Sequence, residues 1–376
     1  MRTPIAWFNT IQNPKRTATA VGGICFSVLL IFMQAGFLGA ARMNASLAYS
    51  ILDFDLIIIS RGYLTMPRSE SIDPYRVIQA SSVPGVAQSS GLLIEGGNWR
   101  NSSTGDSSSC FVFGISTEAR TFLDPAVNAK TPLLKDSLTA MVDLRSRPAY
   151  GPWAIGGAAN VNNQSLQVVG DYSLGMGLLA DGSVVVSHST YARLFGQNAA
   201  DRYNFGLVKV SPGENPETVA ERLRRALADD VVISTKAEIM RREERYFVSV
   251  KPVGIMFQVG MGVAFIVGAV ILYQILSSEI SNRMKEFATL KAMGYTELYI
   301  YGIGISQGIY FSLMGYFPSL VLSFLLYRVL RSLSGFPVYM DMNRALFVFA
   351  LTLGMCVIAA ALSLGKIKRA DPADLF

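Results

Sequence analysis

Four long apolar segments constrain the fold of this chain more than any other feature of its sequence. They cover residues 18–41, 253–276, 298–327 and 345–365, and the first two contain no charged residue. A helix that crosses a bilayer needs about 20 predominantly apolar residues. The sequence therefore predicts an α-helical membrane protein with four transmembrane helices.

The composition excludes two broad classes of protein. Hydrophobic residues make up 51% and charged residues only 16% of the 376 residues, whereas about 25% of residues are charged in a soluble domain. The mean hydropathy is +0.35. An ordinary soluble enzyme and an intrinsically disordered protein are both excluded by these values.

The first apolar segment has two interpretations. Basic residues precede it, and Gly39, Ala40 and Ala41 offer small residues for cleavage, as in a secretory signal peptide. Its apolar run over residues 18–41 is longer than the roughly 7–15 residues usual in such a peptide. We therefore favour an uncleaved membrane anchor.

Lysine and arginine indicate the orientation of the helices, because the cytoplasmic flanks of membrane helices are rich in both. One side of the membrane would carry Arg2, Lys15, Arg16, Arg283, Lys285, Lys291, Lys366, Lys368 and Arg369, and the other would carry Arg328, Arg331 and Arg344. Both termini are therefore expected in the cytoplasm, and the long segment between the first two helices outside it.

The formal charge of +6 belongs to these flanks. Residues 42–252 contain 21 basic and 21 acidic residues, so that the remaining residues carry the whole excess. No basic face is left for nucleic acid, and we exclude nucleic-acid binding.

Residues 42–252 are long enough for a folded domain, and alternating apolar residues with turn residues predict a mixed α/β fold. The expected strands are 55–60, 86–94, 110–115, 166–169, 183–186, 205–210 and 231–234, and the expected helices are 73–81, 189–195 and 216–228, the last capped by Asn215. Residues 98–109 are polar and are expected to form a mobile loop.

Two further helices would connect this domain to the membrane. Residues 42–50 are expected to continue the first membrane helix, and residues 235–252 to lead into the second. Together they would form a rigid stalk. The alternative is two ordinary domain helices with flexible linkers.

The chain lacks the residues of common catalytic sites. His188 is its only histidine, and Cys110 is the one cysteine outside the apolar segments, so neither a zinc site nor a disulfide is expected there. A phosphate-binding GxxxxGK[ST] loop is also absent. We expect a non-catalytic subunit without metal or cofactor of its own. A membrane-anchored enzyme is the least favoured hypothesis.

The segment between the second and third membrane helices has the pattern of an amphipathic helix. Apolar residues Ile280, Met284, Phe287 and Leu290 recur at helical spacing. Around them lie the charged residues Glu279, Arg283, Lys285, Glu286 and Lys291, and the sequence Met293-Gly294-Tyr295 ends the helix. Such a helix can dock on a soluble partner, or it can lie on lipid headgroups.

Small residues recur at fourfold spacing in two membrane helices. They are Gly260, Ala264 and Gly268 in the second helix and Gly304 and Gly308 in the third. Small residues allow the backbones of neighbouring helices to approach closely in lipid. These positions predict either packing within the chain or a face for a second copy.

Several segments resemble one family of membrane proteins. KEFATLKAMGY (285–295) is similar to the cytoplasmic segment of the FtsX/LolC/MacB (type VII) class of permeases. FIVGAVILYQILSSEI (265–280), RPAYG (147–151), ADGSVVVS (180–187) and ADPADLF (370–376) resemble the DevC family, the permease subunit of a tripartite ABC exporter first associated with cyanobacterial glycolipids.

The resemblance implies a homodimeric permease of the bacterial inner membrane that exports a glycolipid or other amphipathic cargo. Its partners would be a cytoplasmic ABC ATPase that holds ATP and magnesium, an HlyD-like periplasmic adaptor, a TolC-like outer-membrane channel and membrane lipids. The coupling residues would be Glu279, Arg283, Lys285, Glu286, Phe287, Leu290, Lys291, Met293, Gly294 and Tyr295, with further contacts from Asp371, Pro372 and Asp374 of the tail. The alternative is an FtsX-like regulator that transmits ATPase motion to a periplasmic hydrolase.

The expected order of segments is as follows. A cytoplasmic amphipathic segment over residues 1–17 precedes the first helix at 18–41, the extracytoplasmic domain at 42–252 and the second helix at 253–276. The coupling helix at 277–297, the third helix at 298–327, a short outer loop at 328–344, the fourth helix at 345–365 and a cytoplasmic tail at 366–376 complete the chain.

Overall fold

The computed structural model describes residue 12 and residues 14–175, 180–284, 286–287, 289, 293–334 and 337–368. The chain divides into two compact units. The membrane unit comprises residues 1–40, 252–334 and 338–376, and the α/β unit comprises residues 41–251 with residues 335–337. Each unit is described by itself.

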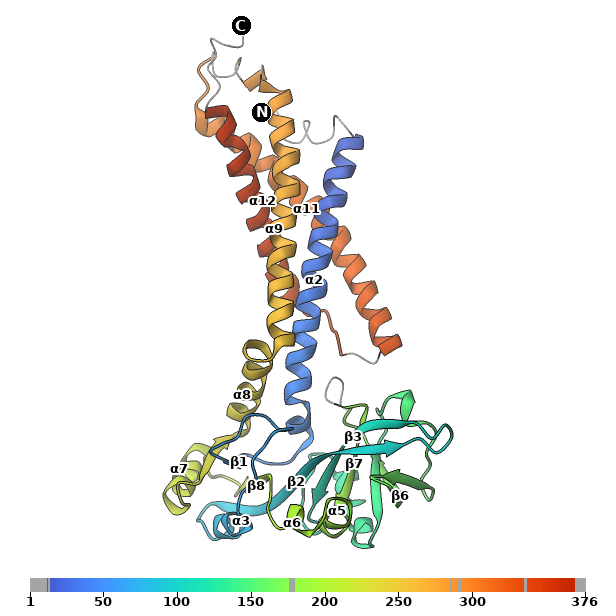
Figure 1. Cartoon of the computed structure of the whole chain (residues 1–376). Helices are drawn as coiled ribbons and strands as arrows, with labels where there is room; N and C mark the ends of the chain where they lie inside the picture. Colours follow the sequence, from blue (N-terminus) through green and yellow to red (C-terminus); the bar gives the residue numbers. More distant parts are fainter. Residues whose placement is uncertain are drawn as a thin grey trace. The chain divides into compact units, whose positions relative to one another are not determined.

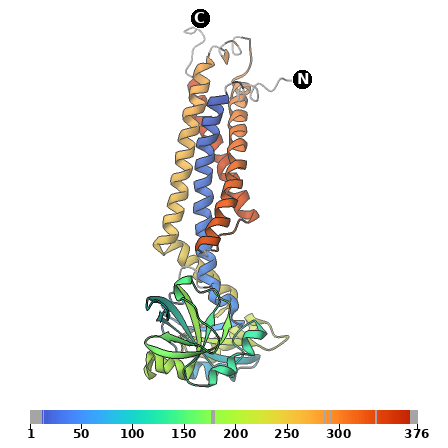
Figure 2. The same cartoon turned by 90° about the vertical axis from the view of Figure 1, so that its right-hand side faces the viewer.

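Among the described residues, four helices are long and apolar enough to cross a membrane. They are α2 (Pro14–Ile51), α9 (Pro252–Asn282), α11 (Glu297–Ser334) and α12 (Met342–Lys368). In the membrane unit, α9 packs against α12 and α12 against α11, and Figures 1 and 2 show these helices side by side with the first part of α2. The predicted fold class, with four membrane helices and a mixed α/β domain between the first two, is confirmed.

The helix α2 is longer than a bilayer requires. It has 38 residues without interruption, which at about 1.5 Å per residue exceeds the roughly 30 Å thickness of the hydrocarbon core. Residues 42–50 thus continue the first membrane helix, as predicted. The connection from the α/β unit to the second membrane helix is not one continuous helix. The helix α8 (Lys236–Ser249) ends at its C-cap residue Val250, and α9 begins at Pro252.

The described part of the α/β unit contains a nine-stranded sheet in the order β3-β7-β4-β6-β5-β2-β8-β1-β9. The strands are β1 (Leu56–Ser60), β2 (Val86–Arg100), β3 (Ser107–Ile115), β4 (Thr139–Asp143), β5 (Ala158–Val161), β6 (Gln164–Tyr172), β7 (Gly182–Ser187), β8 (Phe205–Val210) and β9 (Val231–Thr235). An additional pairing of β3 with β2 closes the strands β2, β3, β7, β4, β6 and β5 into a ring.

The long strand β2 belongs to both parts of this sheet. Its first half pairs with β8, from Val86 to Leu92, and its second half pairs with β3, from Leu93 to Arg100. The ring encloses a core that includes Val112, Val142 and Val184. All seven predicted strands are present, and the short strands β4 and β5 were missed.

Helices cover the sheet and begin where their caps predict. They are α3 (Pro74–Ser81), α4 (Pro125–Asn128), α5 (His188–Phe195), α6 (Gln197–Ala200), α7 (Pro216–Ala226) and α8, with two short 3₁₀ helices at Thr131–Lys135 and Pro148–Tyr150. The Asp73 carboxylate accepts a hydrogen bond from Tyr75 N, and the Asn215 side chain accepts one from Glu217 N. The three predicted helices are therefore confirmed, with α7 ending two residues early.

The prediction of a mobile loop over residues 98–109 is wrong. Asn98 pairs with Ser109, Trp99 with Ser108 and Arg100 with Ser107, so most of this stretch is a β-hairpin. Trp99 is buried and stacks on Tyr150 with ring centroids 4.5 Å apart. The polar residues misled the prediction because successive side chains of a strand point to opposite faces, so that one face of a paired strand can be polar and face water.

Candidate functional site

The apolar face of the amphipathic segment after α9 is used within the chain. Ile280 and Phe287 are buried with Leu364 of α12, and Met284, Tyr301 and Ile305 pack against them. The face that the sequence offered for a soluble partner therefore fixes the segment to its own membrane unit. Of the apolar residues predicted to contact a partner, Phe287 is buried, Met293 is exposed and Leu290 lies outside the described residues.

Charged residues fix the same segment from another direction. Glu279 is buried, and its carboxylate lies 3.7 Å from the Arg283 guanidinium, which also lies 3.5 Å from the Glu286 carboxylate. Arg283 donates a further hydrogen bond of 2.8 Å to Gln12 Oε1. Arg283 thus links the end of α9 to the segment that precedes α2.

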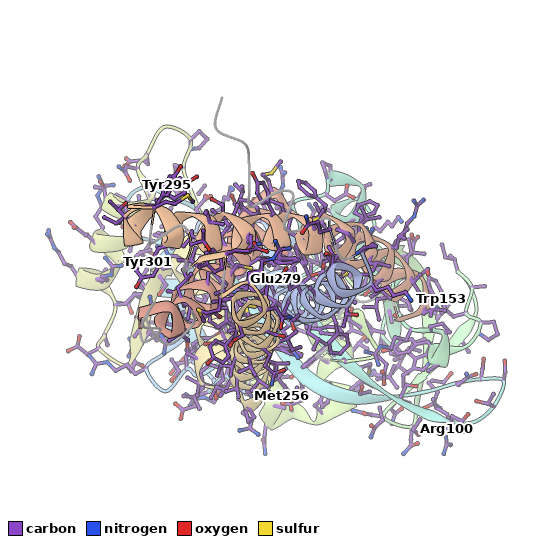
Figure 3. All side chains as sticks on the ribbon, turned by 90° about the horizontal axis from the view of Figure 1, so that it is seen from above. Arg100, Trp153, Met256, Glu279, Tyr295 and Tyr301 are labelled. Carbon is purple, nitrogen blue, oxygen red and sulfur yellow. The ribbon has the colours of Figure 1, made fainter. Side chains whose placement is uncertain are left out.

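Four residues in and just after this segment are exposed, and we call Glu286, Met293, Tyr295 and Leu298 the exposed patch. The exposed fractions are 67% for the side chain of Glu286, 62% for Met293, 46% for Tyr295 and 82% for Leu298. Tyr295 stacks on Tyr299 with ring centroids 4.9 Å apart. Figure 3 shows Tyr295 at the beginning of α11 and Glu279 among the helices.

Two local features place the exposed patch. Gly294 has a φ of +88°, a conformation that glycine adopts without strain, and it turns the chain between the amphipathic segment and α11. Leu298 lies in the first turn of α11, where a leucine with 82% exposure has no partner within the described chain. The sequence did not single out Leu298, because it stands at the edge of an apolar membrane segment.

Several predicted coupling residues lie outside the described residues. They are Lys285, Leu290 and Lys291 of the segment and Asp371, Pro372 and Asp374 of the tail. The expected amphipathic segment over residues 1–17 is also largely outside them. Their roles stay predictions.

The five small residues predicted for close helix packing all lie against neighbours within the chain. A Cβ atom at Gly268 would lie 2.3 Å from Met355 Sδ, and one at Gly304 would lie 2.7 Å from Leu364. Similar contacts surround Gly260, which faces Gln34, and Gly308, which faces the Cys356 carbonyl, while Ala264 is buried. The contacts of these positions fit the predicted packing of helices within the chain.

The α/β unit has a polar cleft next to α3. Two adjoining hollows of about 410 and 440 Å³ share Ser116, Glu118 and His188. More than half of the other lining residues carry hydroxyl or amide groups: Ser81, Gln88, Ser89, Ser90, Thr117, Ser187, Ser189 and Tyr203. Volumes of this size are usual for ligand sites, but such sites are mostly apolar.

Two residues of α3 expose apolar surface, and one of them lines this cleft. Val77 and Ala80 bury one face of the helix, whereas Tyr75 and Ile78 are more than 60% exposed. Ile78 also lines the cleft. The sequence carries a signal for this surface, because Tyr75 and Ile78 are three residues apart on the polar face of an amphipathic helix.

His188 has a structural role in the cleft. Its Nε2 lies 3.2 Å from the Gly91 carbonyl oxygen and its ring packs on Tyr203. Burial lowers the pKa of His188 from its usual value near 6.5. Among the described residues, no group of three His, Cys, Asp or Glu side chains is placed to hold a metal ion.

Two parts of the chain are similar to known protein families. Residues 17–226 match the family model described as MacB-like periplasmic core domain, and residues 259–372 match FtsX-like permease C-terminal. An uncharacterised ABC transporter permease of Methanocaldococcus jannaschii is 27% identical over 195 residues. That match covers 50% of this chain and 47% of the relative, so the chain spans about half the length of the curated relative.

The chain is also similar over about half its length to solved structures. The periplasmic region of MacB from Actinobacillus actinomycetemcomitans has a TM-score of 0.37 at 14% identity, over 51% of this chain and 92% of that one. The extracellular domain of the noncanonic ABC-type transporter YknZ from Gram-positive bacteria has a TM-score of 0.34 at 12% identity, over 48% of this chain and 98% of that one.

Proposed function

Because the chain belongs to the MacB/FtsX-type permease family, we propose that it is the membrane subunit of an ABC transporter and works with a separate cytoplasmic ATPase. The observation that carries this proposal is the exposed patch of Glu286, Met293, Tyr295 and Leu298 on and beside a segment whose apolar face is buried against its own membrane unit. The sequence has no GxxxxGK[ST] loop of its own, so the nucleotide would be bound by a partner.

The exposed patch has the composition of a docking surface. Tyrosine and methionine are enriched at protein interfaces, and a charged residue at the rim adds specificity. Glu279, Arg283 and Phe287 would then hold the patch in place, because all three are largely buried. Motion of the ATPase would pass to α9 through this rigid attachment.

Substitutions that change the charge of the patch test the docking assignment. Glu286→Arg together with Tyr295→Asp should abolish co-purification of the ATPase in mild detergent, while the yield of membrane-inserted protein stays unchanged. Glu221→Arg is the matched control, because Glu221 is similarly exposed on α7 of the other unit. If the doubly substituted chain still retained the ATPase, the patch would not be the docking surface.

A second copy of the chain would pack on α9. In the most apolar stretch of α9, only 17% is buried within the chain, whereas 33–39% is buried in the corresponding stretches of the other three membrane helices. Its exposed residues Met256, Val259, Val263, Ile266 and Val270 recur at alternating spacings of three and four, which is the pattern of a helix–helix seam.

Cysteine cross-linking in the native membrane tests this dimer. In a chain without its three native cysteines, Val263→Cys should form a disulfide-linked dimer upon oxidation. Leu362→Cys, on an exposed position of α12, should not. Equal cross-linking at both positions would indicate random collision and contradict the seam.

The polar cleft and α3 are where we place the extracytoplasmic partner, an HlyD-like adaptor leading to a TolC-like channel. Exposed Tyr75 and Ile78 supply apolar contacts beside a hydroxyl-rich hollow, as in the centre and rim of an interface. Ile78→Asp should weaken adaptor capture, whereas Ile155→Asp, at a similarly exposed position, should not. A hydrolase captured instead of an adaptor would favour the FtsX-like regulator.

The cargo and the orientation complete the proposal. The resemblance to DevC proteins favours a glycolipid or another amphipathic cargo, and the apolar segments of the four helices offer no charged path through the membrane. The same resemblance favours a bacterial inner membrane, and the distribution of lysine and arginine favours an orientation with both termini in the cytoplasm. Export assays with labelled glycolipid and protease protection of terminal tags test these two statements.

A further inference from the structure

A buried carboxyl group lies where two helices meet inside the α/β unit. Glu243 of α8 is fully buried, as is Tyr49 near the end of α2. Ile239 and Glu243 are one turn apart and are the buried residues of α8. A glutamate is rarely found at such a position unless its charge is paired.

The hydrogen bonds around Glu243 form a chain that starts on α2. The Tyr49 and Tyr63 hydroxyl oxygens are 2.6 Å apart, whereas Tyr49 Oη is 3.4 Å from Glu243 Oε1. The single Tyr49 proton is therefore best placed toward Tyr63. The Tyr63 hydroxyl donates to Glu243 Oε1, which also accepts a bond of 2.8 Å from Met66 N.

The second oxygen of the same carboxyl group is buried without a hydrogen bond. Among the described residues, Glu243 Oε2 has no hydrogen-bond partner. A buried ionised oxygen without a partner is costly, and a proton on it removes most of that cost. Burial accordingly raises the pKa of Glu243 to about 8.

The charged neighbours do not neutralise Glu243 by pairing with it directly. Arg242 lies 5.1 Å over the Tyr63 ring and donates to the Tyr63 carbonyl oxygen at 2.6 Å. Glu244 accepts a hydrogen bond from Ser46 Oγ on α2. Lys251, beyond the end of α8, only partly offsets the effect of burial on the Glu243 pKa. Phe205 of β8, which packs on both tyrosines, is apolar.

We propose that Glu243, Tyr63 and Tyr49 form a protonation-dependent latch, in which the neutral carboxyl group holds the end of α2 against α8 and the ionised group releases it. Its significance for transport rests on the proposed function, because α2 and α8 are the segments through which the chain enters and leaves the α/β unit. The latch itself is a property of this chain alone.

The direction of the pH dependence follows from proton binding. An unfolded glutamate has a pKa of about 4.3, and folding raises the pKa of Glu243 to about 8. Between these values the folded chain holds a proton that the unfolded chain lacks. The stability that Glu243 contributes is therefore fully present below the lower value and is lost as the pH rises through the higher one.

Hydrogen exchange of the full chain in detergent tests the latch without any partner. After correction for intrinsic exchange rates, residues 43–51 and 236–249 should lose protection by roughly tenfold between about pH 6.5 and about pH 9.5. Glu243→Gln, which imitates the neutral carboxyl group, should keep its protection at both values. Glu244→Gln is the matched control and should behave like the unmodified chain.

Two results would overturn the latch. One is equal protection of the unmodified chain at both pH values, and the other is an equal loss of protection in the Glu243→Gln chain. If Glu243→Gln does not fold, Glu243→Met must show exchange that does not depend on pH in this window. Loss of ATPase docking with the latch intact would contradict the proposed function alone.

Discussion

Phe287 and Leu364 are buried in one apolar cluster of the membrane unit. The first residue belongs to the short segment after α9 and the second to α12, so the segment is attached to the helix bundle by its apolar face. The exposed residues of this region include the patch of Glu286, Met293, Tyr295 and Leu298. Attachment and docking are thus assigned to different residues of one segment.

Substitutions on the two faces should have separate effects. Phe287→Ala removes a buried aromatic side chain and should cost about 3 kcal/mol of stability. Tyr295→Ala should change stability by less than about 0.5 kcal/mol but reduce ATPase binding. Thermal unfolding in detergent measures the first effect and co-purification the second. If Tyr295→Ala unfolded the chain as much as Phe287→Ala, the separation would be wrong.

Close helix packing at Gly268 should make it intolerant of even one methyl group. A Cβ atom there would meet Met355 and Ser27, whereas one at Gly354 would meet nothing within 4 Å. Gly268→Ala should therefore lower the unfolding temperature, with a cost of about 1–3 kcal/mol from overpacking. Gly354→Ala serves as the control, and an equal effect at both positions would contradict the packing.

The hairpin that replaces the expected loop should be a rigid part of the α/β unit. Trp99→Ala removes the stack on Tyr150 and a buried ring, at a cost of about 3–5 kcal/mol. Arg100→Ala alters the next residue, which is exposed, and should change stability by less than about 0.5 kcal/mol. Chemical denaturation of the full chain measures both losses of stability. If residues 98–109 formed a mobile loop, both substitutions would cost little.

His188 should make the α/β unit less stable in acid. Burial lowers its pKa below the usual value near 6.5, so the unfolded chain binds more protons than the folded chain in this range. Stability should therefore fall as the pH drops below about 6.5, the opposite of the dependence expected from Glu243. Thermal unfolding as a function of pH should show a smaller acid loss in His188→Gln. An unchanged loss in that variant would exclude His188 as the cause.

The sequence predicted the larger elements because their patterns are long. Apolar runs identified the four membrane helices, and the cap Asn215 helped to identify α7 of the α/β unit. The strands β4 (TAMVD) and β5 (AANV) are about as short as β1 (LIIIS) and β9 (VVIST), but they lack the runs of β-branched residues that mark those two strands.

The candidate site was predicted less well than the fold. An amphipathic pattern shows that Phe287 is buried, but it does not show whether a partner or the chain's own Leu364 covers it. Glu243 was missed because α8 is rich in charge, and a charged residue is ordinarily placed on the solvent face. Only the tertiary contacts of Tyr49 and Tyr63 distinguish Glu243 from its exposed neighbours.

Site-specific photo-cross-linking at Tyr295 tests the central claim most directly. With a photoreactive phenylalanine analogue in place of Tyr295, irradiation of intact cells should join this chain to a protein that carries a nucleotide-binding GxxxxGK[ST] loop. The same analogue at Val321, an exposed position within α11, should not give that product. A Tyr295 product with lipid alone, or with no nucleotide-binding protein, would contradict the assignment of this chain as the subunit that docks the ATPase.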